Sequence, residues 1–335
     1  MRKRMMDYGV YLGRFPRGKR NLITDVDGVK VGNYTLITDE PHVFRTGITV
    51  VFPHTECVYE NRVMASYFVL NGYGKSTGLI QLEELGLLEA PIFITSTLNV
   101  GKVWDGVVSY ITSKVPHAMS INPVVMECND GKVSESIYRP LGAYEVFKAI
   151  ESASDIFSLG NVGAGTGMTT FGYKGGLGSA SRKVGDYTVG VLVVSNFGRK
   201  EDLEGHINGD TSETEVGSII VIVATNAPLM PRQLKRLSKR GALGIAKAGG
   251  FATHGSGDIV LAFSTAHRIP RKGAVQSLNY IPDDDKLFQK LMDATVFAVW
   301  EAIYDALLTA DDMIGKNGRL WKAVSPEVII RKVGS

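Results

Sequence analysis

Short apolar runs alternate along this chain with longer stretches whose apolar residues recur at helical spacing. The apolar runs predict strands at 48–52, 91–97, 123–127, 187–195, 219–224 and 258–263. The helical spacing predicts helices at 77–88, 99–113, 143–152, 229–248 and 286–310. Such alternation is typical of an α/β protein, in which helices cover a sheet. Because no clean linker divides the 335 residues, we predict one α/β domain, residues 1–335, of a two-layer or four-layer type.

The composition argues against two classes of partner. Hydrophobic residues make up 44% of the chain and charged residues 21%, as in ordinary folded proteins. A net charge of +3 is small for this length and gives no reason to expect nucleic acid. The apolar stretch 286–310 carries Lys290, Asp293, Glu301 and Asp305, so it predicts a helix packed in the core and not a membrane span. We therefore predict neither a nucleic-acid partner nor a membrane partner.

Basic residues concentrate near the start of the chain: Arg2, Lys3, Arg4, Arg14, Arg17, Lys19 and Arg20. No long apolar stretch follows them, so no signal peptide is expected. Two cysteines, Cys57 and Cys128, do not make a disulfide framework in a chain of this size, and we predict a cytoplasmic protein. The basic segment is interpreted as a solvated arm, with a role in assembly or nucleic-acid contact as the alternative.

Glycine-containing stretches do not match the nucleotide-binding motifs. In NGYGKSTG, residues 71–78, Val69 stands where the phosphate-binding loop requires its first glycine, so a turn leading into a helix is predicted. The passage 160–181 contains no G-x-G-x-x-G, and its glycines indicate either a wall of backbone amides beside a site or an irregular loop. None of the six histidines stands at metal-ligand spacing from another. We predict no metal and no cofactor.

The dipeptide Gly217–Ser218 separates a polar segment from the apolar run that begins at Ile219. The polar segment, 199–217, carries six acidic residues and predicts an exposed loop. A hydroxyl at the first position of a buried strand is either the end of a turn or a nucleophile. If the chain is cut before Ser218, that residue gains an α-amine, whose pKa of roughly 7.7–8.0 in peptides leaves much of it neutral. The amine can then take the proton of its own hydroxyl, and a glycine tolerates the strain of attack on its carbonyl.

The chain resembles the DmpA-type aminopeptidases, the family of L-aminopeptidase/D-amidase/esterases and β-peptidyl aminopeptidases. The resemblance covers nearly the whole chain, in blocks that keep the family order, including NLITDVDGVKVGNYT, FVLNGYGKSTGL, PVVMECNDG, GNVGAGTGMTTFGYKGGLGSASR, VSNFG and GSIIVIVATNAPLMPRQL. The family consists of self-cleaving N-terminal-nucleophile hydrolases with a four-layer α/β/β/α sandwich. The resemblance implies a cut between Gly217 and Ser218. Chains 1–217 and 218–335 would then form one non-covalent fold, and such pairs would assemble as a homotetramer.

Individual site residues also carry over from the resemblance. Ser218 matches the family's nucleophile, and Asn196 in VSNFG matches the asparagine that stabilises the oxyanion, where the sequence alone indicates a strand end. Ser256 and Asp258 in GSGD match the second serine and the acidic residue that orient the nucleophile, where the sequence alone indicates a turn. Glu127 in PVVMECNDG matches the acidic residue that holds the substrate's amine. Asp130 is its competitor for that role.

Two segments depart from the family pattern and bear on specificity. Lys132–Glu135 stands where the family usually has an aromatic or aliphatic residue and then an Asn-Asp pair, and TSTLNVG replaces Thr-Asn-Thr-x-x-Val-Gly. Both segments line the substrate pocket in the family. We therefore expect an aminopeptidase or amidase for small peptides, amides or esters with a free amine, and α-peptides, D-amino amides, β-peptides and esters all stay open. The alternatives are an acyltransferase of the ornithine acetyltransferase type and an unprocessed binding protein on the same fold.

Overall fold

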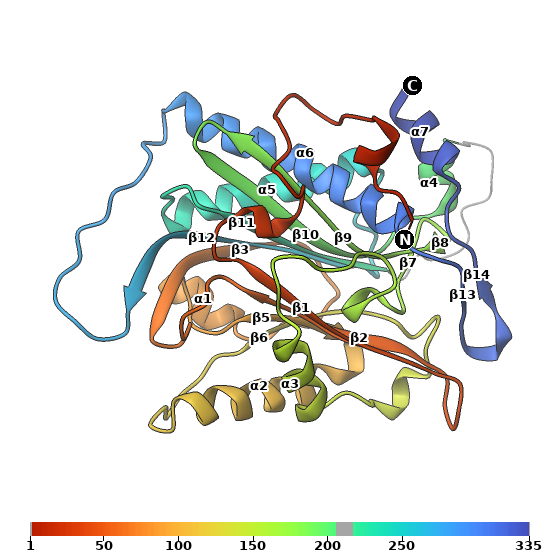
Figure 1. Ribbon diagram of the computed structural model, residues 1–335, viewed down its shortest axis with the longest axis horizontal. Coiled ribbons are helices and arrows are strands. Elements are labelled where there is room, and N and C mark those ends of the chain that lie inside the picture. The colour runs from red at the N-terminus through yellow and green to blue at the C-terminus, as the bar shows by residue number, and fades with distance from the viewer. Residues whose placement is uncertain (1, 206–216, 335) are drawn as a thin grey trace.

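Two β-sheets lie face to face, and helices cover the outer face of each sheet (Figure 1). The computed structural model describes residues 2–205 and 217–334. From one side to the other, the layers are a helix pair, a six-stranded sheet, a four-stranded sheet and a second helix pair. The predicted four-layer α/β/β/α architecture is therefore confirmed.

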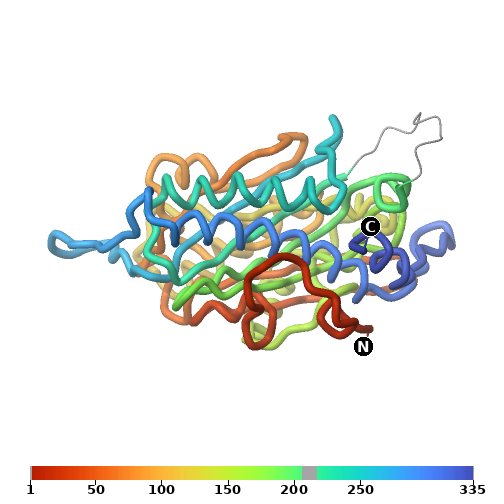
Figure 2. Tube along the Cα trace, turned by 90° about the horizontal axis from the view of Figure 1, so that it is seen from above, coloured from red at the N-terminus to blue at the C-terminus, as the bar shows by residue number. Residues whose placement is uncertain are grey.

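The six-stranded sheet has the order β4-β3-β12-β11-β10-β9. Only β11 and β12 run parallel among its described neighbours, and the chain joins them through α5. Helices α5 (Pro231–Ala248) and α6 (Lys286–Leu308) lie side by side on its outer face (Figure 2). The strands are β3 (Asn61–Gly72), β4 (Leu87–Leu88), β9 (Gly176–Val184), β10 (Tyr187–Asn196), β11 (Ser218–Thr225) and β12 (Gly257–Pro270).

The four-stranded sheet has the order β1-β2-β5-β6, and β5 and β6 run parallel. Helices α2 (Val100–Lys114) and α3 (Ala143–Glu151) cover its outer face. Its strands are β1 (Lys30–Thr38), β2 (Phe44–Phe52), β5 (Ile92–Ser96) and β6 (Val124–Cys128). The shorter elements are α1 (Leu79–Leu85), α4 (Lys200–Glu204), α7 (Pro326–Gly334), β7 (Thr169–Thr170), β8 (Tyr173–Lys174), β13 (Met313–Ile314) and β14 (Leu320–Trp321), with 3-10 turns at Met5–Tyr8, Ile23–Asp25, Thr97–Asn99, Ser136–Tyr138, Gly163–Gly165 and Lys316–Gly318.

The apolar run of β11, residues 219–224, is explained by the two cores that the strand separates. Ile219, Val221 and Val223 belong to the core under α5 and α6, while Ile220 and Ile222 belong to the core between the two sheets. A strand buried on both faces reads as a continuous hydrophobic run and does not alternate with polar residues. Because successive side chains point to opposite faces, the first residue of the strand shares the inter-sheet face with Ile220.

The element boundaries depart from the sequence expectations in a few places. The predicted helix 77–88 ends at Leu85, because Gly86 takes a left-handed conformation with φ 63° and the chain then forms β4. Strands β1 and β3 were not predicted, and β12 runs past the predicted residue 263 to Pro270. Among the helices of the described residues, none has both the length and the apolar character that crossing a membrane requires.

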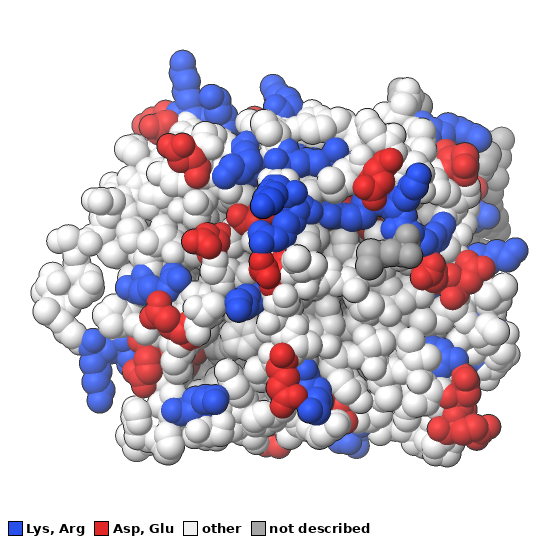
Figure 3. Space-filling model, viewed as in Figure 1, with Lys and Arg blue, Asp and Glu red and all other residues white. Residues whose placement is uncertain are grey.

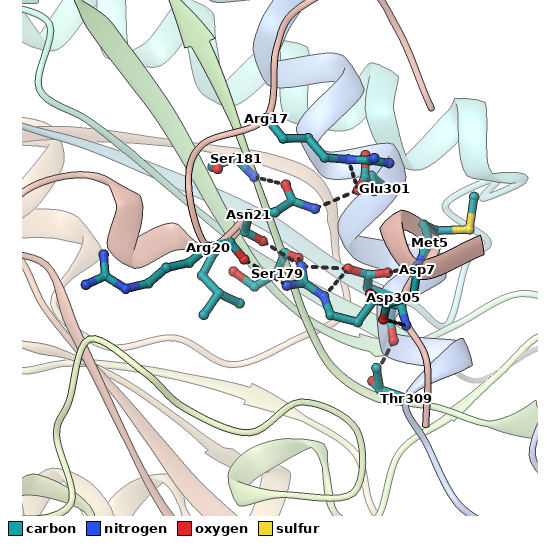
Figure 4. Close-up of polar contacts among 12 residues, drawn as sticks. Met5, Asp7, Arg17, Arg20, Asn21, Ser179, Ser181, Glu301, Asp305 and Thr309 are labelled. Carbon is teal, nitrogen blue, oxygen red and sulfur yellow. Dashed lines mark hydrogen bonds and ion pairs between the residues drawn. The ribbon is translucent and has the colours of Figure 1, made fainter. Parts of the chain in front are cut away.

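The basic N-terminal segment is not a solvated arm, and that prediction is wrong. It lies along α6, where Arg4 pairs with Asp305 at 2.7 Å and Arg17 pairs with Glu301 at 2.8 Å (Figure 4). The face of the molecule seen in Figure 3 carries a gathering of Lys and Arg side chains near its upper centre. Both carboxylates are fully buried, and a buried charge is tolerated only when it is paired. Burial raises the pKa of Asp305 to about 6 even though Arg4 opposes the shift. The segment is thus held by the core helix that carries its counter-charges, while Arg14 and Lys19 do reach solvent.

Replacing Glu301 with glutamine is expected to destabilise the fold by about 3–5 kcal/mol, because guanidinium charge is left buried without its partner. Glu301 accepts hydrogen bonds from Arg17 (2.8 Å), Asn21 (2.7 Å) and the fully buried Arg182 (2.5 Å). Urea unfolding at neutral pH measures the change. Glu84→Gln, on the exposed side of α1, is the control and is expected to stay within about 0.5 kcal/mol of the parent. Equal unfolding midpoints for both variants would contradict the assignment.

Candidate active site

Ser218 is the first residue of β11, in the interior of the six-stranded sheet. Its register partners are Asn196 at the end of β10 and Gly257 at the start of β12. Only 3% of Ser218 is exposed, and by the alternation of the strand its hydroxyl faces the inter-sheet layer. Because strands pair with Ser218 on both sides, the sheet holds the backbone of Ser218 in one position.

Two N–H donors reach the Ser218 hydroxyl. The backbone N–H of Asn129 lies 3.3 Å from its Oγ, and the side-chain amide of Asn196 lies 3.4 Å from it. The same Asn196 amide donates to the carbonyl of Asn129 at 3.0 Å. Its oxygen accepts the backbone N–H of Thr169 at 2.9 Å, so the nitrogen points toward Ser218. Two donors converge on one oxygen without any side chain needing to move.

The glycine-rich passage 160–181 holds the Asn196 side chain in this orientation. Thr169 of that passage orients Asn196, so one backbone amide of the passage does contact the site. The buried Lys174 donates to the carbonyls of Met168 and Gly175, each at 2.7 Å. Burial lowers the pKa of Lys174 to about 7. Lys174 therefore links residues 168 and 175 of the passage, and so holds in place Thr169, the residue that contacts Asn196.

Ser256 and Asp258 flank Gly257, the strand partner of Ser218. Both are buried, and the Ser256 hydroxyl donates to the Asp258 carboxylate at 2.6 Å. The N–H of Gly257 donates to the carbonyl of Gly217 at 3.3 Å. The structure thus brings both predicted residues next to the backbone of Ser218, and the Ser256 hydroxyl is bonded to Asp258 and not to Ser218.

Glu127 stands near the end of β6 and is almost fully buried. Its carboxylate accepts the backbone N–H of Lys75 at 3.0 Å and the hydroxyl of Thr97. A Cβ on Gly74 would lie 3.5 Å from Glu127 Oε1 and 3.2 Å from Gly257 Cα, so Gly74 contacts both Glu127 and the strand partner of Ser218. Glu127 is therefore part of the same site.

Asp130 lies deeper than Glu127, and its burial favours the protonated carboxyl. It is 1% exposed, and burial raises its pKa to about 7, with the charge of Glu127 adding to the shift. Gly167 packs directly on it, because a Cβ there would lie 2.6 Å from the Asp130 Cβ. A carboxyl held partly protonated is a weaker partner for a substrate ammonium than one that already accepts two hydrogen bonds.

Cys128, between these residues, contributes a neutral thiol. Burial raises the pKa of its thiol well above the usual range, and a hydrogen bond with Ser218 only partly opposes this. The thiol donates to the carbonyl of Val194 at 3.4 Å. Since the thiolate is the reactive form of cysteine, Cys128 packs beside the serine without competing with it as a nucleophile.

The structure brings together five predicted side chains, those of Ser218, Asn196, Ser256, Asp258 and Glu127, with residues that were not predicted. Asn129 and Thr169 act through backbone groups, which no side-chain pattern reveals. Lys75 belongs to the stretch NGYGKSTG, residues 71–78, which does not match the phosphate-binding loop, and no role in the site was predicted for it. That stretch does form a turn into α1, as predicted, and Thr77 joins it to β6 through Val125.

Two sequence expectations concern residues around the site. The predicted exposed loop 199–217 begins with α4 and ends at the buried Gly217, and its residues 206–216, with Asp210, Glu213 and Glu215, lie outside the described residues. Within residues 2–205 and 217–334, no three His, Cys, Asp or Glu side chains are grouped so that they could hold a metal ion.

Comparisons with known proteins agree on one family. The model of peptidase family S58 matches residues 21–321. The β-peptidyl aminopeptidase BapA of Sphingosinicella microcystinivorans is 39% identical over 94% of this chain and 88% of its own. The crystal structure of the PH0078 protein from Pyrococcus horikoshii OT3 has a TM-score of 0.92 at 42% identity, with 99% of each chain covered. The L-aminopeptidase D-Ala-esterase/amidase of Ochrobactrum anthropi, described as a variant of the Ntn hydrolase fold, has a TM-score of 0.89 at 33% identity, again over 99% of each chain.

Proposed function

The chain belongs to peptidase family S58 and is an aminopeptidase or amidase, and on that premise we propose that it cuts itself between Gly217 and Ser218 and then hydrolyses substrates with Ser218. Chains 1–217 and 218–335 remain together in the one fold. One observation carries the proposal: a buried serine hydroxyl at the start of a central strand, with the N–H groups of Asn129 and Asn196 on its oxygen.

The self-cleavage step follows from the surroundings of Gly217. The Ser218 oxygen attacks the Gly217 carbonyl carbon, the C–N bond breaks, and the released nitrogen becomes the α-amine of Ser218. The resulting ester is hydrolysed by water. The N–H of Gly257 donates to the carbonyl oxygen on which negative charge develops. A glycine fits here because a Cβ would lie 2.8 Å from the carbonyl oxygen of Asn196 and 3.0 Å from Phe197 Cα.

Substrate hydrolysis uses the amine that the cut releases. The α-amine takes the Ser218 proton, the hydroxyl oxygen attacks the scissile carbonyl, and the same proton goes to the leaving amine. The N–H donors of Asn196 and Asn129 stabilise the oxyanion next to Oγ. Ser256, bonded to Asp258, orients the new amine, and the carboxylate offsets its charge. Water then hydrolyses the acyl-enzyme and restores Ser218.

Glu127 is the proposed ligand for the free amine of a small peptide, amide or ester. Its carboxylate is buried, so an ammonium bound there gains a charge-assisted hydrogen bond in a poorly solvated place. The names of the relatives make both α- and β-aminoacyl substrates worth testing.

Glu127→Gln is expected to raise KM for α- and β-aminoacyl p-nitroanilides by about tenfold or more, because a neutral amide replaces the charged acceptor. Steady-state kinetics on intact and N-acetylated substrates measures the effect. The parent enzyme should hydrolyse the free-amine forms and leave the acetylated forms untouched. Asp130→Asn is the competing variant. A larger rise in KM for Asp130→Asn than for Glu127→Gln would transfer the amine-binding role to Asp130.

A further inference from the structure

The segment that follows β3 lies across the turn that precedes β12. The side chain of Asn71 donates to the carbonyls of Thr253 (3.0 Å) and Ser256, and the backbone N–H of Tyr73 donates to Ser256 at 3.3 Å. These bonds fix the chain at residue 74 against Gly257. The next residue, Lys75, is thereby placed at the edge of the amine site, one residue after the glycine that packs against the strand partner of Ser218.

Lys75 contacts Glu127 twice. Its backbone N–H donates to Glu127 Oε1 at 3.0 Å, and its ammonium lies 3.8 Å from the same oxygen. The Lys75 side chain is 58% exposed, whereas that of Glu127 is 4% exposed. The lysine therefore reaches from solvent to a buried carboxylate. It has a flexible stem, and its ammonium can move aside without disturbing the backbone contact.

This arrangement has a consequence for the charge balance when a substrate binds. A substrate ammonium placed on Glu127 displaces the Lys75 ammonium and leaves two positive charges close together. Two like charges repel more strongly in a poorly solvated place near a protein surface than they do in bulk water. A carboxylate on the same substrate residue removes that repulsion, because it gives the displaced lysine a new partner.

We propose that Lys75 makes the enzyme prefer substrates whose N-terminal residue carries a carboxylate beside its free amine, with β-aspartyl amides as the best-fitting class. The inference rests on the proposed function, in which Glu127 holds the amine and Ser218 attacks the carbonyl. In a β-aspartyl amide the amine and the α-carboxylate share one carbon, and the scissile carbonyl follows one methylene later. The amine binds Glu127, the carboxylate binds Lys75, and hydrolysis releases aspartate and the leaving amine.

The decisive comparison uses β-aspartyl and β-alanyl p-nitroanilide, which differ only in the α-carboxylate. The parent enzyme is expected to have the higher kcat/KM for the β-aspartyl substrate. In Lys75→Met the ratio of the two kcat/KM values is expected to fall about tenfold, which corresponds to ~1.4 kcal/mol. In Lys75→Glu it should fall further, while Lys75→Arg should retain the preference. Lys235→Met, which breaks the pair between Lys235 of α5 and Glu83 of α1, is the matched control and should leave the ratio unchanged.

Two results would overturn the inference: a ratio that is the same in the parent enzyme and in Lys75→Met, or a parent enzyme that prefers the β-alanyl substrate. A parallel pair, α-aspartyl and α-alanyl p-nitroanilide, tests the position of the carboxylate. A stronger Lys75-dependent preference in that pair would overturn the β-aspartyl assignment. Failure of the proposed function looks different, because neither β-substrate would then be hydrolysed by any variant and the chain would stay uncut.

Discussion

Ser218→Ala is expected to leave the protein as one uncut chain without hydrolytic activity. The variant has no oxygen to attack the Gly217 carbonyl, so the α-amine that serves as base is never released. Loss of a serine nucleophile in other hydrolases lowers kcat on the order of 10⁶-fold, and here the base is lost with it. An intact mass spectrum under denaturing conditions should show fragments 1–217 and 218–335 for the parent and one mass for the variant.

Ser264→Ala is the matched control for this experiment. Ser264 is also a buried serine of the six-stranded sheet, and its hydroxyl donates to the carbonyl of Ala227, away from Ser218. This variant should still be cut and active. An uncut but active parent enzyme would contradict the proposal, because Ser218 would then have no free amine to act as its base.

Asn196→Ala is expected to lower kcat by about 10²–10³ with little change in KM, the usual cost of removing one oxyanion donor. The side-chain amide of Asn196 lies on the Ser218 oxygen, and its effect should grow as charge develops in the transition state. Steady-state kinetics on processed enzyme measures the change. Since Asn196 also accepts the Thr169 N–H, folding must be checked in the same preparation.

Asn226→Ala provides a control with the same structural loss. The Asn226 side chain accepts the backbone N–H of Thr188 at 2.7 Å, at the other end of the β10–β11 ladder. Both variants therefore lose one side-chain oxygen that accepts a backbone N–H. Only Asn196 also contacts Ser218. Equal kinetic losses in the two variants would show that the Asn196 effect comes from altered folding and not from oxyanion stabilisation.

The apolar pattern predicted the most apolar buried strands and the long helices. Strand β11 is the clearest example, since residues 219–224 alternate between two cores. Strand β9 is also buried along most of its length, but its sequence GLGSASRKV carries no apolar run and was not predicted. Strand β3 was missed although residues 63–70 are apolar apart from Ser66. The N-terminal arm was misjudged because the partners of Arg4 and Arg17 lie about 300 residues away in sequence, on a helix whose charged residues were taken only as evidence against a membrane span.

The candidate site was predictable only where a side chain carries the chemistry. Ser218 was an alternative raised by the Gly217–Ser218 dipeptide and favoured by the family resemblance, whereas Asn196 and Glu127 came from the resemblance alone. Strand pairing explains why Ser218 and Asn196 meet. Asn129 donates to Ser218 through its backbone N–H, so its position depends on how β6 of one sheet packs against β11 of the other and not on its side chain. Lys75 was visible in the sequence, but its link to Glu127 requires the packing of two distant segments.

The strand order has a consequence for the lifetime of the enzyme. Strands β11 and β12 belong to 218–335, and strands of 1–217 border them on both sides, β10 on one and β3 on the other. In the proposed two-chain form the pieces are interleaved, so they cannot separate on dilution without unfolding. An uncut chain closes these contacts within one molecule, whereas separated pieces must find each other at a rate set by their concentration. The fold would thus be assembled once, and the survival of each molecule would depend on how slowly it unfolds rather than on an equilibrium.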